Sequence, residues 1–286
     1  MNYNDVTIGI VTFKSEKVIF NCLKSIKNIK KIIIFDNSND IELKHKILKK
    51  YPKIQFIVSK KNLGYGGGNN QILKKSKTKY FFLLSPDTIL KKKCEQELMK
   101  KINKIKDFSL IAPFAKEKNF GFFQENNENK KNKNKNVLEV DYVKGFAMLF
   151  NTKKIKKFKM FDENIFLYLE EIDLCKRVKD EKGRIILINA ELTHEVGFSH
   201  GKRDDFEMEK SRNWHWMWSK FYYSKKHKGY IYGFIITLPN FFSAIFKFIF
   251  YSLINRKKKE IYKMRILGLL NSYLKKRSFY RPYTNN

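Results

Sequence analysis

The sequence predicts an α/β fold with a mostly parallel central sheet, followed by a helical C-terminal region. Three observations support this prediction. Short apolar runs alternate with segments of helical periodicity between residues 6 and 113. Several of the short runs are rich in β-branched residues and apolar on both faces, as strands of a buried parallel sheet are. Beyond about residue 205 the chain becomes strongly aromatic and apolar. We therefore expect two regions, residues 1–205 and 206–286.

The first predicted strand covers residues 6–13, VTIGIVTF. The alternation continues as helix 16–29, strand 31–35, helix 42–50, strand 54–59, a glycine-rich loop, helix 70–76, strand 80–84, helix 91–105 and strand 109–113. In such sheets, ligands bind beyond the carboxyl ends of the strands. The residues directly after each strand are therefore the candidate functional residues.

The chain after residue 113 predicts a smaller α+β part of the same domain. Residues 125–136, ENNENKKNKNKN, contain no apolar side chain and predict a surface insertion. A strand at 143–150, a helix at 169–182 and a strand at 184–188 are expected after it.

The net charge points to an anionic partner. It is +32, from 60 Lys and Arg against 28 Asp and Glu, and a balance of this kind favours nucleic acid or an anionic membrane surface. Only eight of the cations are arginine, the residue whose guanidinium makes bidentate hydrogen bonds to phosphates and guanine edges. The lysine excess also accompanies many Asn, Ile, Phe and Tyr residues, as an AT-rich coding sequence produces. We therefore expect no nucleic acid partner.

The cysteines and the N-terminus carry little functional signal. Cys22, Cys94 and Cys175 form no CxxC motif, so neither a disulfide framework nor a thiolate zinc site is predicted. The N-terminal residues lack a basic segment followed by an apolar one, so no signal peptide is expected.

Polar and glycine residues follow the second and third predicted strands. Asp36, in the run FDNS, can accept a hydrogen bond from a nucleobase edge or form an Asx turn, and both alternatives stay open. Residues 62–70, NLGYGGGNN, contain four glycines that permit close backbone approach, and the following helix start offers donors to phosphate. The run matches neither the P-loop nor the dinucleotide pattern, and a flexible loop is the alternative.

Carboxylates and a histidine complete the candidate site. Asp87, in the turn SPDT after the fourth main strand, suits a hard divalent cation completed by diphosphate oxygens, or a helix N-cap. Three carboxylates in the run YLEEIDLCKR open a helix, where the dipole favours them and where one can act as a general base. In the run HEVGFSH, His194 is a candidate metal ligand in concert with Asp87, whereas His200 is expected to be incidental.

The C-terminal region carries membrane-like features. Residues 229–254 contain one charged side chain, Lys247, and four cations follow at 256–259. Pro239 and Asn240 are expected to interrupt the apolar run. A single membrane span, a helical hairpin embedded in or lying on a membrane, and a soluble helical packing element are the alternatives.

Taken in order, the segments TIGIVTF, FDNS, NLGYGGGNN, SPDT, FDENIFLYLEEIDLCKR and THEVGFS resemble the GT-A glycosyltransferases of family 2, especially the bacterial rhamnosyltransferase-like branch. The likeness covers about residues 5–200 in both order and spacing. It implies a GT-A (nucleotide-diphospho-sugar transferase) fold. It also implies inverting transfer of rhamnose or a similar hexose from a nucleoside diphosphate to a hydroxyl of a lipid-linked or surface glycan.

The resemblance also implies roles for individual residues. Contacts with the nucleoside are expected at the first two strand ends: Thr12, Phe13 and Asp36. Contacts with the donor sugar and diphosphate are expected in the glycine-rich run: Asn62, Gly64 and Asn70. Mg²⁺ or Mn²⁺ is expected on Asp87 and His194. Glu171 is implied as the catalytic base, with Asp173 as a second contributor.

Two positions depart from the family pattern. The sequence has Ser-Pro-Asp where Asp-x-Asp is usual, so the metal has one protein carboxylate fewer. The base is Glu171 where the family has Asp, and its side chain is one methylene longer.

The expected partners are a nucleoside diphosphate sugar and a glycan or lipid-linked acceptor. The protein is expected to bind the anionic cytoplasmic face of the bacterial inner membrane. A homodimer through the C-terminal helices is a further expectation. The rival from another class is a non-catalytic basic protein that binds anionic membrane or nucleic acid. A nucleotidyltransferase is disfavoured because the segment TFKSEK after the first strand lacks glycine.

Overall fold

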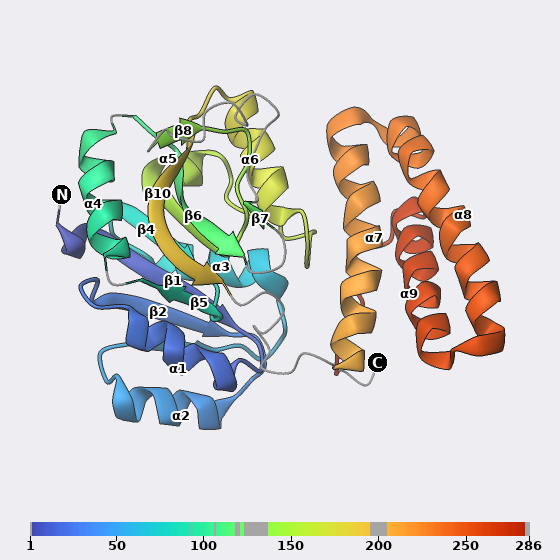
Figure 1. Ribbon diagram of the computed structural model, residues 1–286, viewed down its shortest axis with the longest axis horizontal. Coiled ribbons are helices and arrows are strands. Elements are labelled where there is room, and N and C mark those ends of the chain that lie inside the picture. Colours follow the sequence, from blue (N-terminus) through green and yellow to red (C-terminus); the bar gives the residue numbers. More distant parts are fainter. Residues whose placement is uncertain are drawn as a thin grey trace. The chain divides into compact units, whose positions relative to one another are not determined.

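The computed structural model describes residues 2–91, 93–105, 107–117, 121–122, 137–194 and 205–283. The chain divides into two compact units (Figure 1). The first contains Met1–Asp162 and Glu171–Arg203, and the second contains Glu163–Glu170 and Asp204–Asn286. The sequence did not indicate that Glu163–Glu170 groups with the C-terminal helices.

A ten-stranded sheet forms the centre of the first unit. Its main path runs β3-β2-β1-β4-β9-β6-β10-β5, with β7 paired to β6 and β8 to β10. The strands are β1 (Val6–Thr12), β2 (Lys31–Asp36), β3 (Gln55–Val58), β4 (Tyr80–Leu84), β5 (Thr88–Leu90), β6 (Leu110–Glu117), β7 (Gly121–Phe122), β8 (Val137–Glu139), β9 (Ala147–Asn151) and β10 (Ile185–His194). The first four of these strands are parallel, as the alternating sequence pattern predicted.

The second half of the sheet differs from the expected parallel continuation. β9 lies between β4 and β6 and is antiparallel to both. β5 was not anticipated and pairs antiparallel with β10. Because β5 has only three residues, it gives too short a period-two pattern to be recognised from the sequence.

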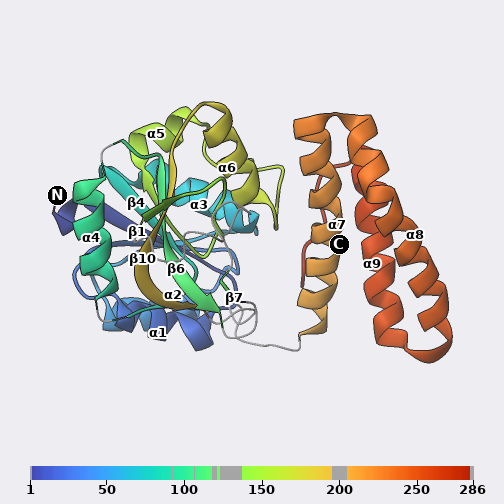
Figure 2. The same ribbon diagram turned by 45° about the horizontal axis from the view of Figure 1, so that its top comes forward.

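Helices cover both faces of the sheet (Figure 2). Side chains of α1 (Glu16–Ser25), α2 (Ile41–Lys50) and α4 (Cys94–Lys104) pack in one core. Side chains of α3 (Gly64–Lys75), α5 (Thr152–Lys157) and α6 (Glu170–Asp180) pack in the other. Neighbouring strand residues alternate between the cores: Phe82 belongs to the first and Phe81 to the second. Burial on both faces explains why these strands are continuously apolar.

The glycine-rich run is helical, which corrects the expected loop. Gly64 has a φ of +75° and begins α3, and the next glycines lie in its first turns. A Cβ atom on Gly68 would lie 2.9 Å from Cγ1 of Val11, and one on Gly67 would lie 3.0 Å from Cβ of Leu63. The glycines therefore allow α3 to pack closely against β1 and its own preceding loop.

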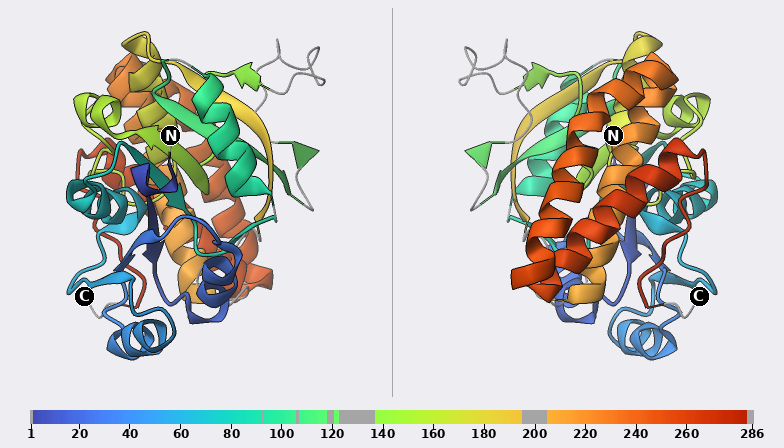
Figure 3. Two further views of the ribbon diagram at one scale, coloured as in Figure 1. Left: turned by 90° about the vertical axis from the view of Figure 1, so that its left-hand side faces the viewer. Right: turned by 90° about the vertical axis from the view of Figure 1, so that its right-hand side faces the viewer.

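The second unit contains three long helices, α7 (Phe206–Lys228), α8 (Tyr230–Ile254) and α9 (Arg256–Tyr273), which pack against one another (Figure 3, orange to red). Met217, Phe221 and Leu269 form their shared core. α8 continues through Pro239, so the expected interruption is wrong. By length and composition, α8 can cross a membrane.

Candidate active site

The ends of β1 and β2 meet through a buried hydrogen bond. The register pairs Thr12 with Asp36, and the Thr12 hydroxyl donates to Oδ1 of Asp36 at 2.8 Å. The Ser38 hydroxyl also donates to Oδ1, and the backbone N–H groups of Ser38 and Asp40 donate to Oδ2 at 3.0 and 2.9 Å. Asp36 therefore forms the Asx turn that the sequence left open. Phe13, half-buried beside it, donates its backbone N–H to the Ser15 hydroxyl.

Asn37 joins this loop to the start of α3. Its Nδ2 donates to the Gly64 carbonyl at 3.0 Å, and its Oδ1 accepts from the Leu63 N–H at 2.9 Å. Oδ1 of Asn62 accepts from the Gly64 N–H at 3.0 Å. The structure thus brings Asn62 and Gly64 to the strand ends where Thr12 and Asp36 lie. Asn37 was not among the residues predicted from the sequence, although it directly follows Asp36.

The two asparagines in α3 have different surroundings. Asn70 holds the backbone of Phe161 from both sides, because its Nδ2 donates to the Phe161 carbonyl at 2.9 Å and its Oδ1 accepts from the Phe161 N–H at 3.0 Å. The expected contact of the Asn70 carboxamide with the donor sugar or its diphosphate stays a prediction. Asn69 is also buried; its Nδ2 donates to the Tyr65 carbonyl, whereas its Oδ1 has no hydrogen-bond partner among the described residues. Asn69 was not among the residues predicted from the sequence.

Asp87 and His194 are brought together by the pairing of β5 with β10. His194 lies opposite Thr88 in this pair, and its Nε2 is 3.5 Å from Oδ1 of Asp87. The imidazole stacks on Phe146 with ring centroids 4.5 Å apart. Asp87 precedes β5 and does not cap a helix, since the N-cap of α4 is Lys93, so the N-cap alternative is wrong.

These two side chains fit a divalent cation. Oδ1 of Asp87 is buried and has no hydrogen-bond donor among the described residues, although it faces the histidine nitrogen. Carboxylate oxygen and imidazole nitrogen are both suitable ligands. The described part of the chain contains no group of three or more His, Cys, Asp or Glu side chains placed to hold a metal. A cation here would therefore have two protein ligands and need the rest from substrate oxygens and water.

Glu171 lies in the first turn of α6 beside the glycine-rich helix. A Cβ built on Gly145 would lie 3.6 Å from Cβ of Glu171 and 3.5 Å from Cε1 of Tyr65. The Tyr65 hydroxyl donates to the Gly145 carbonyl at 2.5 Å. Burial raises the pKa of the Glu171 carboxyl, against the opposing effects of the Glu171 and Ile172 backbone N–H groups and the Lys144 charge. A carboxyl with a raised pKa is a stronger base once it is ionised.

Asp173 has a structural partner. It is fully buried, and its Oδ2 accepts a hydrogen bond from Nε of Arg177 at 2.9 Å, one turn along α6. The same guanidinium donates to the carbonyls of Phe158 and Met160. Asp173 thus balances a cation that ties α6 to the preceding loop, and its contribution to the base stays a prediction.

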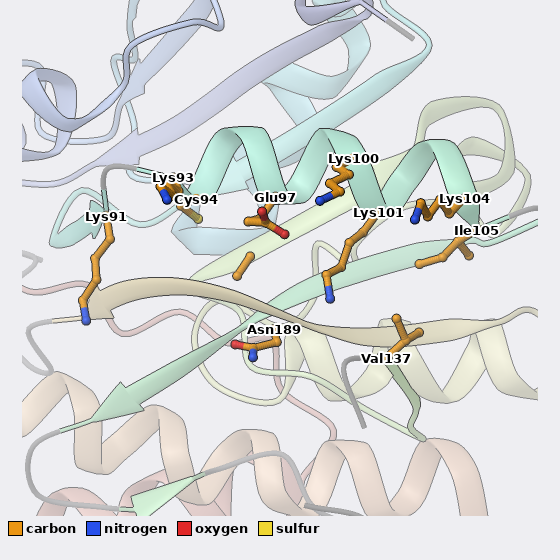
Figure 4. Close-up of a pocket in the computed structure, with 11 residues that line it drawn as sticks. Lys91, Lys93, Cys94, Glu97, Lys100, Lys101, Lys104, Ile105, Val137 and Asn189 are labelled. Atoms are coloured by element: carbon orange, nitrogen blue, oxygen red, sulfur yellow. The ribbon is translucent and has the colours of Figure 1, made fainter. Parts of the chain in front are cut away.

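A separate cavity of about 940 Å³ lies between α4 and β10 (Figure 4). Among the described residues that line it, none belongs to the predicted site. Its charged lining residues are Lys91, Lys93, Glu97, Lys100, Lys101 and Lys104. The predicted donor site and this lysine-lined cavity are therefore different places on the first unit.

Solved structures of low sequence identity share the fold. The mannosyltransferase PcManGT from Pyrobaculum calidifontis, in complex with GDP-Man and Mn²⁺, gives a TM-score of 0.57 at 10% identity, covering 96% of this chain and 88% of that one. S. aureus TarS 1-349 gives 0.56 at 14% identity, covering 98% and 93%. GalNAc-T7 with UDP, GalNAc and Mn²⁺ gives 0.53 at 11% identity, covering 83% and 57%. These likenesses establish a GT-A-like fold.

The sequence is similar to a known hexosyltransferase and matches a protein family. The low-salt glycan biosynthesis hexosyltransferase Agl10 of Haloferax volcanii is 27% identical over 195 residues. The match spans 62% of this chain and 62% of that relative. The sequence model of glycosyl transferase family 2 matches residues 7–162, more than half of the chain and the part that carries the strand ends, α3 and Asp87. The chain therefore belongs to glycosyl transferase family 2.

Proposed function

We propose that the protein is an inverting, metal-assisted hexosyltransferase that moves rhamnose or a similar sugar from a nucleoside diphosphate to a glycan hydroxyl. The main observation behind the proposal is the pair of Asp87 and His194. Oδ1 of Asp87 is buried and accepts no hydrogen bond from the described residues, so it can bind a cation. The name of the relative Agl10 supports hexosyl transfer in glycan biosynthesis. The complexes of two structural neighbours with Mn²⁺ support a divalent cation, Mg²⁺ or Mn²⁺.

Glu171 is the proposed base. Its carboxylate accepts the proton of the acceptor hydroxyl as that oxygen forms a bond to the anomeric carbon. The bond between the anomeric carbon and the diphosphate oxygen breaks on the opposite face, and the diphosphate leaves with the electron pair. Attack from the opposite face inverts the anomeric configuration. General-base assistance of this kind contributes about 10²- to 10⁴-fold in rate.

Asp87 and His194 would hold the cation next to the diphosphate. When bound, the cation neutralises negative charge that develops on the leaving group. The first turns of α3 lie at the ends of β1 and β2 and can donate backbone N–H groups to phosphate oxygens. The hydrogen bond from Thr12 to Asp36 joins the two strand ends where the nucleoside would bind.

A donor screen tests this function. We expect one nucleoside diphosphate sugar, or a small group sharing one nucleoside, to raise the Tm of the full-length protein in the presence of Mn²⁺. EDTA should remove most of the shift, because substrate oxygens complete the metal shell. If no donor raises the Tm while anionic vesicles or nucleic acid bind, the protein is the non-catalytic basic binder.

We also propose that α8 attaches the enzyme to the cytoplasmic face of the membrane, where a lipid-linked acceptor would be found. Of the 18-residue apolar window in this helix, 17% is buried. Phe246, Ile249 and Leu253 are 70%, 61% and 88% exposed. Lys258 and Lys259 follow the helix and lie over the rings of Tyr251 and Phe248. Aromatic side chains beside lysines are typical of helices that bind anionic interfaces.

Replacing Phe246, Ile249 and Leu253 together with glutamine should release the protein from anionic vesicles. Burying each such side chain contributes about 1.5–3 kcal/mol, so the triple variant should move from the pellet to the supernatant on sedimentation. Ile41→Gln is the control, because Ile41 is an exposed apolar residue outside α8. Wild-type protein that stays in the supernatant, especially as a dimer, would instead make α8 a dimerisation element.

A further inference from the structure

The segment Glu163–Glu170 belongs structurally to the C-terminal helical unit, although its sequence lies inside the catalytic region. The chain passes directly from this segment into Glu171, the proposed base. Contacts that hold residues 163–170 therefore act on the backbone that leads into α6. This inference rests on the proposed function, since it concerns the placement of that base.

Phe166 anchors the segment to α7 and to the C-terminal tail. Its side chain is buried, and its ring centroid is 4.5 Å from that of His215. The guanidinium carbon of Arg281 lies 3.8 Å from the same ring centroid, a distance at which a cation is attracted to the ring face. Two separate parts of the second unit thus contact one aromatic side chain of the segment.

His215 is itself fixed as a neutral ring. It is fully buried, and burial lowers the pKa of its imidazole to about 3. Nε2 is 2.8 Å from the Tyr280 carbonyl oxygen, which can only accept, so Nε2 carries the proton. Nδ1 then accepts from the Ser278 hydroxyl at 3.0 Å. The ring against Phe166 is therefore held by two hydrogen bonds and is uncharged at neutral pH.

Two more contacts follow along the segment. The Ser219 hydroxyl, fully buried in α7, donates to the Leu167 carbonyl at 2.8 Å. The Tyr168 ring meets Trp216 edge-on, with centroids 5.6 Å apart. Three consecutive residues, Phe166 to Tyr168, are thus each held by α7.

The backbone directly after these contacts is strained. Tyr168 and Leu169 have φ values of +68° and +69°, in the left-handed region that non-glycine residues rarely adopt. Such conformations persist only where the surrounding structure imposes them. These two residues stand in succession immediately before Glu170 and Glu171. The contacts from α7 supply the constraint that this turn needs.

We propose that α7 and the C-terminal tail hold Phe166–Tyr168 and so impose the left-handed turn at Tyr168 and Leu169, from which the chain continues directly into Glu171, the proposed base. Ser219, His215 and Arg281 are positioning residues in this arrangement.

Ser219→Ala in the full-length protein tests the proposal, with Ser272→Ala as the matched control. Ser272 is also buried, and its hydroxyl donates to the Trp218 carbonyl at 3.0 Å, so its loss removes a similar bond within the same helices without touching the segment. Hydrogen exchange should become faster in peptides covering residues 163–172 for Ser219→Ala and stay unchanged there for Ser272→Ala. The kcat should fall about three- to tenfold in Ser219→Ala only, the size expected for one hydrogen bond, while the KM for the donor stays constant.

A second pair of variants checks the aromatic anchor. Phe166→Ala should show the same two effects more strongly, and Phe166→Leu should restore most of the kcat because it refills the site between His215 and Arg281. Unchanged exchange at 163–172 in both Ser219→Ala and Phe166→Ala would overturn the proposal, as would faster exchange with an unaltered kcat. Absence of any transferase activity in the wild type would instead overturn the proposed function, and hydrogen exchange would still report on these contacts.

Discussion

Replacing Glu171 with glutamine is expected to lower kcat by about 10²- to 10⁴-fold, the contribution of a general base, and to leave donor affinity nearly unchanged. Glutamine has almost the same shape but cannot accept the acceptor's proton. The donor contacts predicted at Thr12, Asp36 and Gly64 are not altered by this substitution. Steady-state kinetics and calorimetric titration of the donor measure the two effects separately.

The pH dependence provides a second signature of the same carboxyl. A base acts when it is deprotonated, and burial raises the pKa of Glu171. The kcat should therefore rise with pH along a limb that lies above the ordinary glutamate pKa of about 4.3, and the glutamine variant should lose this limb.

Glu181→Gln is the control for this substitution, since Glu181 is an exposed glutamate just beyond the end of α6. It should keep the wild-type kcat and pH profile. A Glu171→Gln enzyme that retains more than about a tenth of wild-type kcat would place the base elsewhere, given the size of effect expected for base removal.

Asp87→Ala is expected to weaken Mn²⁺-dependent binding of the nucleoside diphosphate by at least about ten- to a hundredfold, the loss typical even for residues that only support metal ligands. The substitution removes the one carboxylate that we assign to the cation. Calorimetric titration with and without Mn²⁺ measures the loss, and binding without the metal should be similar in both proteins.

Asp141→Ala serves as the matched control for Asp87, because the Asp141 side chain is 62% exposed and lies outside the predicted site. It should bind as the wild type does. If nucleoside diphosphate binding and activity withstand both EDTA and Asp87→Ala, the site works without metal, and backbone donors of α3 must stabilise the leaving group alone.

The sequence predicted the first half of the sheet well because its strands are buried on both faces. β1 is buried along its whole length and mostly apolar, as expected for a central strand of a parallel sheet. The glycine-rich run was misjudged because glycine disfavours helices in isolation. Its helical state depends on contacts with Val11 and Leu63 that only tertiary structure reveals.

The candidate site was predictable where residues directly follow strands. The pairing of Thr12 with Asp36 follows from two adjacent parallel strands. The approach of His194 to Asp87 depends on the pairing of β5 with β10, which was not anticipated. The resemblance implied only that the two side chains share a metal. The ion pair of Asp173 with Arg177, one turn away on α6, was not anticipated from the sequence.

The contacts that hold residues 163–170 against α7 and the C-terminal tail could not be inferred from the sequence. It joins Phe166 and Leu167 to side chains about 50 or more positions later, at Ser219 and Arg281. A contact between residues so far apart in the chain leaves no periodic pattern in the local sequence. The left-handed turn at Tyr168 and Leu169 was equally hidden, because neither residue type favours it.

The most direct test of the central claim is release of nucleoside diphosphate from a panel of sugar donors by the full-length protein on anionic vesicles that carry lipid-linked acceptor. We predict that one donor is consumed in the presence of Mn²⁺, that release stops with EDTA, and that the Glu171→Gln protein releases little. No consumption of any donor, together with no Mn²⁺-dependent binding of a nucleoside diphosphate, would contradict the assignment of Asp87, His194 and Glu171 to sugar transfer.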